Sequence, residues 1–155
     1  MRFTVSGLSV QPFQPLFALD DAALASRNIR RVTADSDRGF PCRISLQDAV
    51  VGESLLLLPY RHHDADGPYR ASGPIFVREA ATVTAVFDNE VPPFLSRRLL
   101  SLRAYDMDGW MHAADVVEGV DADACLRRMF ADERIARIHI HNARPGCYAC
   151  RVDRA

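Results

Sequence analysis

Residues 135–154 constrain the fold of this chain more than any other segment. They read IARIHIHNARPGCYACRVDR, two runs of alternating side chains that flank a Pro-Gly turn. Side chains alternate between the two faces of a strand, so such runs predict an antiparallel β-hairpin. With residues 142–146 as the loop, the symmetric register pairs His141 with Cys147 and Ile138 with Cys150.

In this register both strands turn their apolar side chains to the same side. The expected core face carries Ala136, Ile138, Ile140, Tyr148, Cys150 and Val152. The opposite face carries Arg137, His139, His141, Cys147 and Arg151. We therefore expect one face of the hairpin to pack on a core and the other to present chemically active groups.

The rest of the chain predicts an α+β fold with a mostly antiparallel sheet, for which curling toward a barrel is one arrangement. Many short alternating runs indicate strands, and the turn Asp108-Gly109 predicts a hairpin. A single helix is expected over about residues 121–132, with a short one near 20–28. The apolar stripe of the helix at residues 121–132 consists of Ala122, Cys125, Leu126, Met129 and Phe130.

Length and composition indicate one domain that covers residues 1–155. No repeat, low-complexity linker or change of composition marks a boundary inside the 155 residues. The net charge of −1 supplies no basic field, so we expect neither nucleic acid nor a membrane as a partner. No apolar run is long enough to span a bilayer.

The 19 basic residues are all arginines, and the absence of lysine excludes several mechanisms. Schiff-base chemistry, a pyridoxal phosphate anchor and a P-loop all require lysine. Arginine forks suit carboxylate or phosphate instead. Four cysteines without a secretory signal predict reduced thiols and a cytoplasmic location. A second copy of the chain, as a homodimer, is the one protein partner we consider.

The polar face of the hairpin allows two kinds of chemistry. Cys147 beside His141 could act as a nucleophile with its base. His139, His141 and Cys147 could instead hold a metal ion, but a fourth ligand is missing, so we expect no metal and no other cofactor. His62 and His63 are adjacent in an extended segment and cannot both face one site.

Several segments together resemble a bacterial family catalogued as domain of unknown function 1203. The likeness covers residues 40–154 and rests on PCRISL, GESLLLLPY, GPYRASGPIFVRE, RLLSLRAYD and HNARPGCYACRVDR. It implies a small bacterial, cytoplasmic protein without an assigned activity, and it supplies no catalytic residue. The motif residues in this chain are Cys42, Arg43, Tyr69, Arg70, Gly73, Pro74, Arg103, Asn142, Gly146, Cys147 and Tyr148.

Our leading hypothesis is a small-molecule site for an anionic ligand. Arg70 and Arg103 would hold the ligand, with Cys147 and His141 beside it as nucleophile and base. Further ligand contacts are expected from Tyr69, Arg43 and Asn142. Whether the chain is an enzyme stays open at this point. The alternatives are a non-catalytic interaction module and, third, a metal-binding protein.

Overall fold

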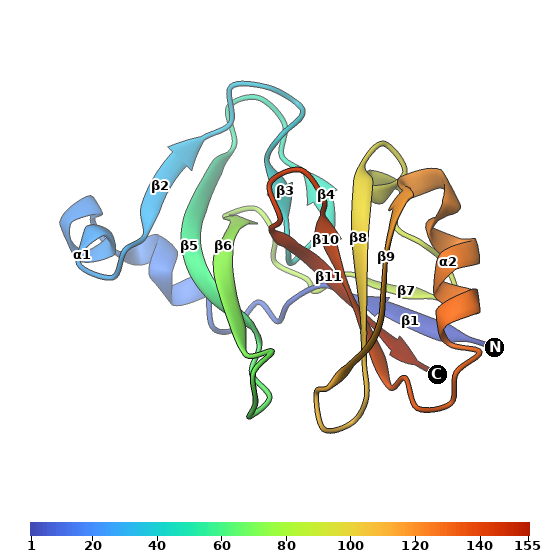
Figure 1. Ribbon diagram of the computed structural model, residues 1–155. Coiled ribbons are helices and arrows are strands. Elements are labelled where there is room, and N and C mark those ends of the chain that lie inside the picture. The colour runs from blue at the N-terminus through green and yellow to red at the C-terminus, as the bar shows by residue number, and fades with distance from the viewer.

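The computed structural model describes all residues from 1 to 155 and divides the strands between two sheets (Figure 1). The six-stranded sheet has the order β7-β1-β11-β10-β8-β9, and the five-stranded sheet has the order β2-β5-β6-β3-β4. Every strand pair is antiparallel except β3 with β6. The first sheet comprises β1 (Phe3–Ser6), β7 (Val86–Asp88), β8 (Leu99–Tyr105), β9 (Met111–Glu118), β10 (Arg137–Asn142) and β11 (Tyr148–Arg154). The second comprises β2 (Arg30–Thr33), β3 (Pro41–Cys42), β4 (Gln47–Asp48), β5 (Ser54–His63) and β6 (Ala71–Arg78).

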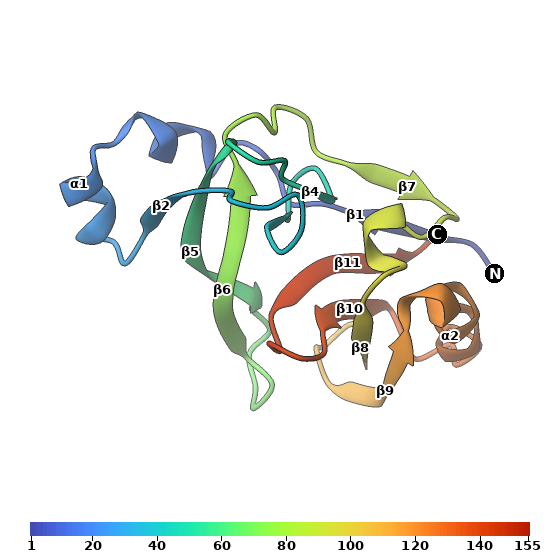
Figure 2. The same ribbon diagram turned by 90° about the horizontal axis from the view of Figure 1, so that it is seen from above.

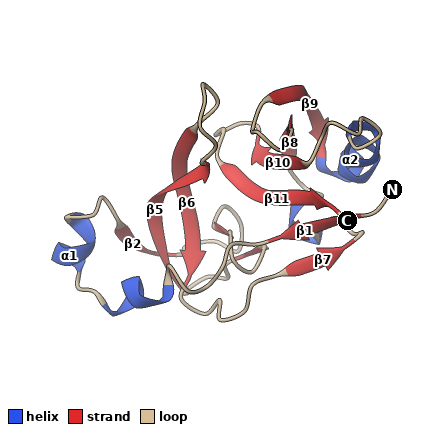
Figure 3. Cartoon of the chain, turned by 90° about the horizontal axis from the view of Figure 1, so that it is seen from below, coloured by secondary structure: helices blue, strands red, loops and turns tan.

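The helices are short and few, as predicted (Figure 3). They are α1 (Asp21–Ala25) and α2 (Ala122–Met129), with 3-10 turns η1 (Gln14–Ala18), η2 (Pro93–Leu95) and η3 (Gly119–Asp121). The α+β class and the one clear helix are confirmed, while the sheets do not close into a barrel. No helix of the structure is long and apolar enough to cross a membrane.

Helix α2 covers one face of the six-stranded sheet (Figure 1). Its predicted stripe, which includes Leu126 and Phe130, is buried against Ile138, Ile140 and Val152 of β10 and β11. Burial of such side chains stabilises the fold by roughly 1.5–3 kcal/mol each. One side of the closing hairpin is therefore occupied by the main core, and only its other side can form a site.

The five-stranded sheet lies on the other side of β10 and β11. Tyr148, the first residue of β11, belongs to the apolar cluster that contains Leu56, Leu58 and Ile75 of β5 and β6. The start of β11 runs beside β6 in two views (Figures 2 and 3). The polar face of the hairpin thus looks toward β5 and β6, and side chains from both sheets meet there.

The predicted register of the closing hairpin is wrong. Ile138 pairs with Val152 and Ile140 with Cys150, a shift of two residues from the symmetric register. A shift of two preserves the face of each side chain, so the core assignment of these four residues is confirmed. A β-bulge then separates Ile140 from His141, whose partner is Tyr148.

The bulge moves Tyr148 from the expected core face to the histidine face. An extra residue in one strand changes the facing of everything beyond it. The physical cause is the turn, in which Gly146 has a φ of 76° and Asn142 accepts a hydrogen bond from its amide. The prediction that Tyr148 shares a face with Ile138, Cys150 and Val152 is therefore wrong, and its ring is buried in the other apolar cluster, next to histidine rings.

Candidate functional site

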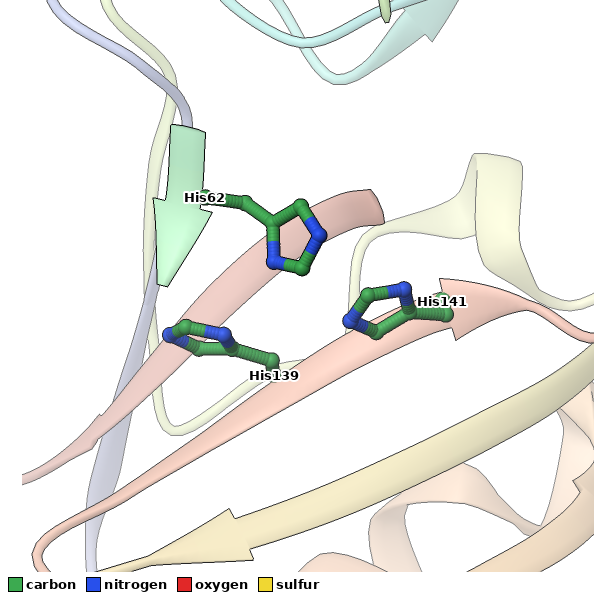
Figure 4. A group of neighbouring side chains, drawn as sticks. All are labelled: His62, His139 and His141. Carbon is green, nitrogen blue, oxygen red and sulfur yellow. The ribbon is translucent and has the colours of Figure 1, made fainter. Parts of the chain in front are cut away.

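Three histidines from two sheets meet on the polar face of the hairpin (Figure 4). His139 and His141 are two residues apart on β10, so strand alternation places both on the same face. His62 comes from the end of β5, where the register with β6 shifts between Arg61 and His63. His62 is the extra residue of this irregularity, and such bulges re-aim a side chain out of the normal alternation.

The three imidazole rings are close enough to share one ligand. The ring centroids of His62 and His141 are 4.9 Å apart, and those of His62 and His139 are 6.1 Å apart. One ring nitrogen from each histidine lies within 4.8 Å of the other two. Figure 4 shows the rings of His62, His139 and His141 pointing toward a common space.

Each of these rings has one buried nitrogen that makes no hydrogen bond. The atoms are Nδ1 of His62, Nδ1 of His139 and Nε2 of His141. A buried polar atom without a partner costs about 1–3 kcal/mol, so three in one place are unusual. The other nitrogen of His141, Nδ1, lies 3.0 Å from the carbonyl oxygen of Gly146. This contact orients the ring and, with Nδ1 as donor, leaves the lone pair on Nε2.

Burial keeps all three imidazoles neutral at physiological pH. Desolvation lowers the pKa of His139 to about 2, with a further contribution from His63. Desolvation also lowers the pKa of His62 and of His141 to about 4, and the nearby charge of Arg103 adds to both effects. A neutral imidazole has a free lone pair, which is the form that binds a metal ion.

The cluster borders a cleft of about 810 Å³. His62 and His139 line this cleft, together with Tyr148, whereas His141 is fully buried behind them. The Tyr148 ring is stacked on His62 at 5.5 Å with an interplanar angle of 7°. Stacking on Tyr148 therefore fixes the orientation of the His62 ring, while His62 and His139 remain open to the cleft.

The predicted pair of Cys147 and His141 has separate partners in the structure. The Cys147 sulfur accepts hydrogen bonds from Arg43 Nη2 at 3.1 Å and from Asn142 Nδ2 at 3.3 Å. These three residues line a second cleft, of about 380 Å³. Cys147 thus joins two other predicted ligand-binding residues rather than the histidines.

The remaining predicted residues occupy two further environments. Arg103 on β8 is directly paired across the sheet with His139, so it lies on the histidine face. Arg70 is exposed, and its Nη2 forms ion pairs with Asp64 at 3.1 Å and Asp66 at 3.3 Å. Tyr69 is 37% exposed and contacts Trp110 edge to face. The structure does not bring Arg70 and Arg103 into one cleft.

His62 is the residue that sequence reasoning did not connect with the hairpin. The expectation that His62 and His63 cannot both face one site is wrong, because both line the same cleft and the His63 ring centroid lies 5.4 Å from that of His139. His63 differs from His62 in that its Nε2 atom lies 3.0 Å from the Gly109 carbonyl oxygen. Nothing in the sequence indicates which of the two is turned by the bulge. The only available signal was the presence of two histidines at the end of a long apolar strand.

Comparisons with known proteins give a family but no described relative. A search of curated proteins and a search of solved structures each found no match. The family described as "Protein of unknown function (DUF1203)" matches residues 39–154, which is about three quarters of the chain. This agrees with the resemblance expected over residues 40–154. The chain belongs to the DUF1203 family.

Proposed function

We propose that this chain is a metal-binding protein whose centre is formed by His62, His139 and His141. The observation that carries the proposal is the set of three unpartnered, buried ring nitrogens on three neighbouring rings. A metal ion would give each of these nitrogens its missing partner in one step. The proposal replaces our sequence-based expectation of no metal, and it takes His62 in place of Cys147 as the third ligand.

The spacing of the nitrogens suits a tetrahedral ion after a small adjustment. Zinc–nitrogen bonds of about 2.0–2.1 Å at tetrahedral angles place the ligand atoms about 3.4 Å apart. The nitrogens lie within 4.8 Å of one another, so binding would draw them closer through rotation of the rings about their side-chain torsions. The neutral state of the rings means that no proton has to leave before the ion binds.

The ligand set favours zinc or a similar first-row divalent ion. Imidazole nitrogens suit these metals, whereas calcium and magnesium prefer oxygen ligands. Three histidines with no fourth protein ligand form the kind of centre that keeps one coordination position for water or substrate. Such an ion lowers the pKa of its bound water toward neutrality and polarises a carbonyl or phosphoryl oxygen.

Nearby positive charge supports an anionic molecule as the ligand of the open position. Arg103 lies directly across from His139, and Arg137 lines the same cleft with its buried Nε atom unpartnered. Neither arginine forms an ion pair. Arginine binds carboxylate and phosphate groups through its planar fork. We therefore retain a small anionic molecule as the substrate class, bound at the metal rather than at Arg70.

The test is a zinc titration of the metal-free chain against a chromophoric chelator. We expect one zinc ion per chain. Zinc should bind at least about a hundredfold more weakly to His62→Gln, His139→Gln and His141→Gln, because each variant replaces one imidazole ligand by a glutamine amide of similar size. His112→Gln is the matched control, since His112 binds Asp106 outside the cluster. Circular dichroism shows whether each variant is folded. Equal zinc affinity in wild type and the three cluster variants would contradict the proposal.

A further inference from the structure

The second cleft, beside the turn between β10 and β11, has features that the metal proposal does not use. It is lined by Arg43, Arg97, Arg98, Asn142, Arg144 and Cys147, among other residues. These come from the loop after β3, the segment before β8 and the β10–β11 turn. None of the three clustered histidines lines it. The two clefts can therefore be tested independently.

Arg43 places a positive charge at the inner side of this cleft. Its side chain is 1% exposed, which is rare for a charged residue. Its guanidinium donates to the carbonyl oxygens of Pro41 and Tyr148 and to the sulfur of Cys147, and no carboxylate contacts it. Buried charges in proteins are normally paired, so the positive charge of Arg43 calls for an anion.

The rim of the cleft adds two more uncompensated charges. Arg97 and Arg144 are exposed, and neither forms an ion pair or a side-chain hydrogen bond within the chain. Arg98 differs, because its Nη2 is 2.5 Å from Oδ1 of Asp48. Of the four arginines of the cleft, Arg98 therefore has an acidic partner, whereas Arg43, Arg97 and Arg144 have none.

Asn142 supplies an independent sign of a ligand. The residue is only 7% exposed, and its Nδ2 atom donates to Cys147 while its Oδ1 atom has no partner. Exchange of the amide oxygen and nitrogen would leave the nitrogen unpartnered instead, so one end of the amide is unsatisfied in either orientation. A buried side chain of this kind needs a partner, and the adjoining cleft is where one can bind.

We propose that this cleft binds a small molecule through a phosphate group, with Arg43 at its base and Arg97 and Arg144 at its rim. Three positive charges favour a group with nearly two negative charges, which phosphate monoesters carry at neutral pH. Because such a phosphate group has only acceptor oxygens, it would satisfy Asn142 in the exchanged orientation, with Nδ2 donating to the phosphate and Oδ1 accepting from the Cys147 thiol. A volume of about 380 Å³ is within the range of small-molecule sites.

Cys147 provides a built-in reporter for this site. Its sulfur is partly exposed and touches both Arg43 and Asn142, whereas Cys42, Cys125 and Cys150 are buried. A phosphate group held by Arg43 would lie beside the sulfur and obstruct a reagent that approaches through the cleft. Binding therefore predicts protection of one identified thiol, which mass spectrometry can follow.

The experiment measures iodoacetamide labelling of Cys147 and the melting temperature of zinc-free chain during titration with inorganic phosphate. Acetate and chloride at matched ionic strength control for screening. We expect phosphate alone to slow the labelling and to raise the melting temperature, with one saturating binding curve for both signals. The double variant Arg97→Met/Arg144→Met should bind phosphate at least about tenfold more weakly, since it lacks both charged hydrogen-bond donors of the rim.

The matched control is Arg27→Met/Arg30→Met, which removes two exposed arginines that do not line the cleft. It should bind phosphate as the wild type does. Equal effects of phosphate, acetate and chloride would overturn the proposal, and so would equal phosphate affinity in the two double variants. Because zinc is removed beforehand, these outcomes do not depend on whether the histidine cluster binds a metal.

Discussion

Arg70 and Arg103 show how different the surroundings of two arginines can be. The sequence suggested that both hold one ligand, but Arg70 pairs with two aspartates at the surface while Arg103 lies across from His139. Their partners depend on which loops meet in space, and an isolated sequence segment does not contain that information.

Replacement of Arg70 by Met tests this difference. The Arg70 side chain is 46% exposed, and ion pairs between exposed side chains contribute about 0–1 kcal/mol. We expect the free energy of unfolding, measured with urea, to change by less than about 1 kcal/mol. Zinc affinity and phosphate affinity should both remain at the wild-type values. A tenfold loss of zinc affinity or of phosphate affinity would show that Arg70 takes part in binding after all.

The four cysteines give a second prediction at the residue scale. Cys150 is fully buried, and this burial raises the pKa of its thiol to about 12, while burial also raises the pKa of Cys125. Only a thiolate reacts with iodoacetamide, so both should label slowly at neutral pH. Cys147 is the partly exposed cysteine and should label first in the native chain. Faster labelling of Cys150 than of Cys147 would contradict the observed strand register.

In the helices and strands, the periodicity of the sequence predicted which side chains lie on each face. The side chains that depart from this pattern lie next to β-bulges. The stripe of α2 and the core face of Ile138, Ile140, Cys150 and Val152 follow from regular spacing and are confirmed. The bulge in β10–β11 reverses Tyr148, and the irregularity in β5 directs His62 to the cluster. A bulge leaves no periodic signal in the sequence, so His62, the third ligand of the proposed centre, could not be connected with the hairpin from the sequence.

The ion pair between Glu53 and Arg78 connects elements of the five-stranded sheet. Arg78 ends β6 and also donates to Ser45 and Gln47, next to and on β4. The two charged side chains are 15% and 17% exposed, so solvent screens them little. The hydrogen bond from Arg78 is the main cause that lowers the pKa of Glu53 below 4.5.

This lowered pKa predicts how the stability of the sheet depends on pH. A carboxyl group whose pKa is lower in the folded state stabilises the fold above its unfolded pKa of 4.5, and loses that effect as pH falls through the folded pKa. We expect Arg78→Met to cost about 1–3 kcal/mol at pH 7, and visibly less at pH 3. Urea unfolding at both pH values measures the difference. If Arg78→Met lowered the free energy of unfolding equally at pH 7 and pH 3, the stabilisation would come from contacts of Arg78 other than its ion pair with Glu53.

For the molecule as a whole, the site is created by the meeting of two sheets. Strand order was not predictable, because alternation tells which face of a strand is apolar but not which strand lies beside it. The chain has five buried side-chain nitrogen and oxygen atoms without partners. Four belong to residues that line the two clefts, namely His62, Arg137, His139 and Asn142, and the fifth belongs to His141, which is buried beside His62. Stable folding alone would favour the removal of such atoms, so their location is the basis on which we propose the two binding sites.

X-ray absorption spectroscopy of the zinc-loaded chain identifies the atoms that bind the proposed metal ion. We predict three imidazole nitrogens at about 2.0–2.1 Å and one further nitrogen or oxygen atom, with no sulfur. The His62→Gln variant should lose one imidazole from this shell or fail to retain zinc. A zinc–sulfur distance of about 2.3 Å would contradict the account, because it would place Cys147 in the centre and remove the role assigned to His62.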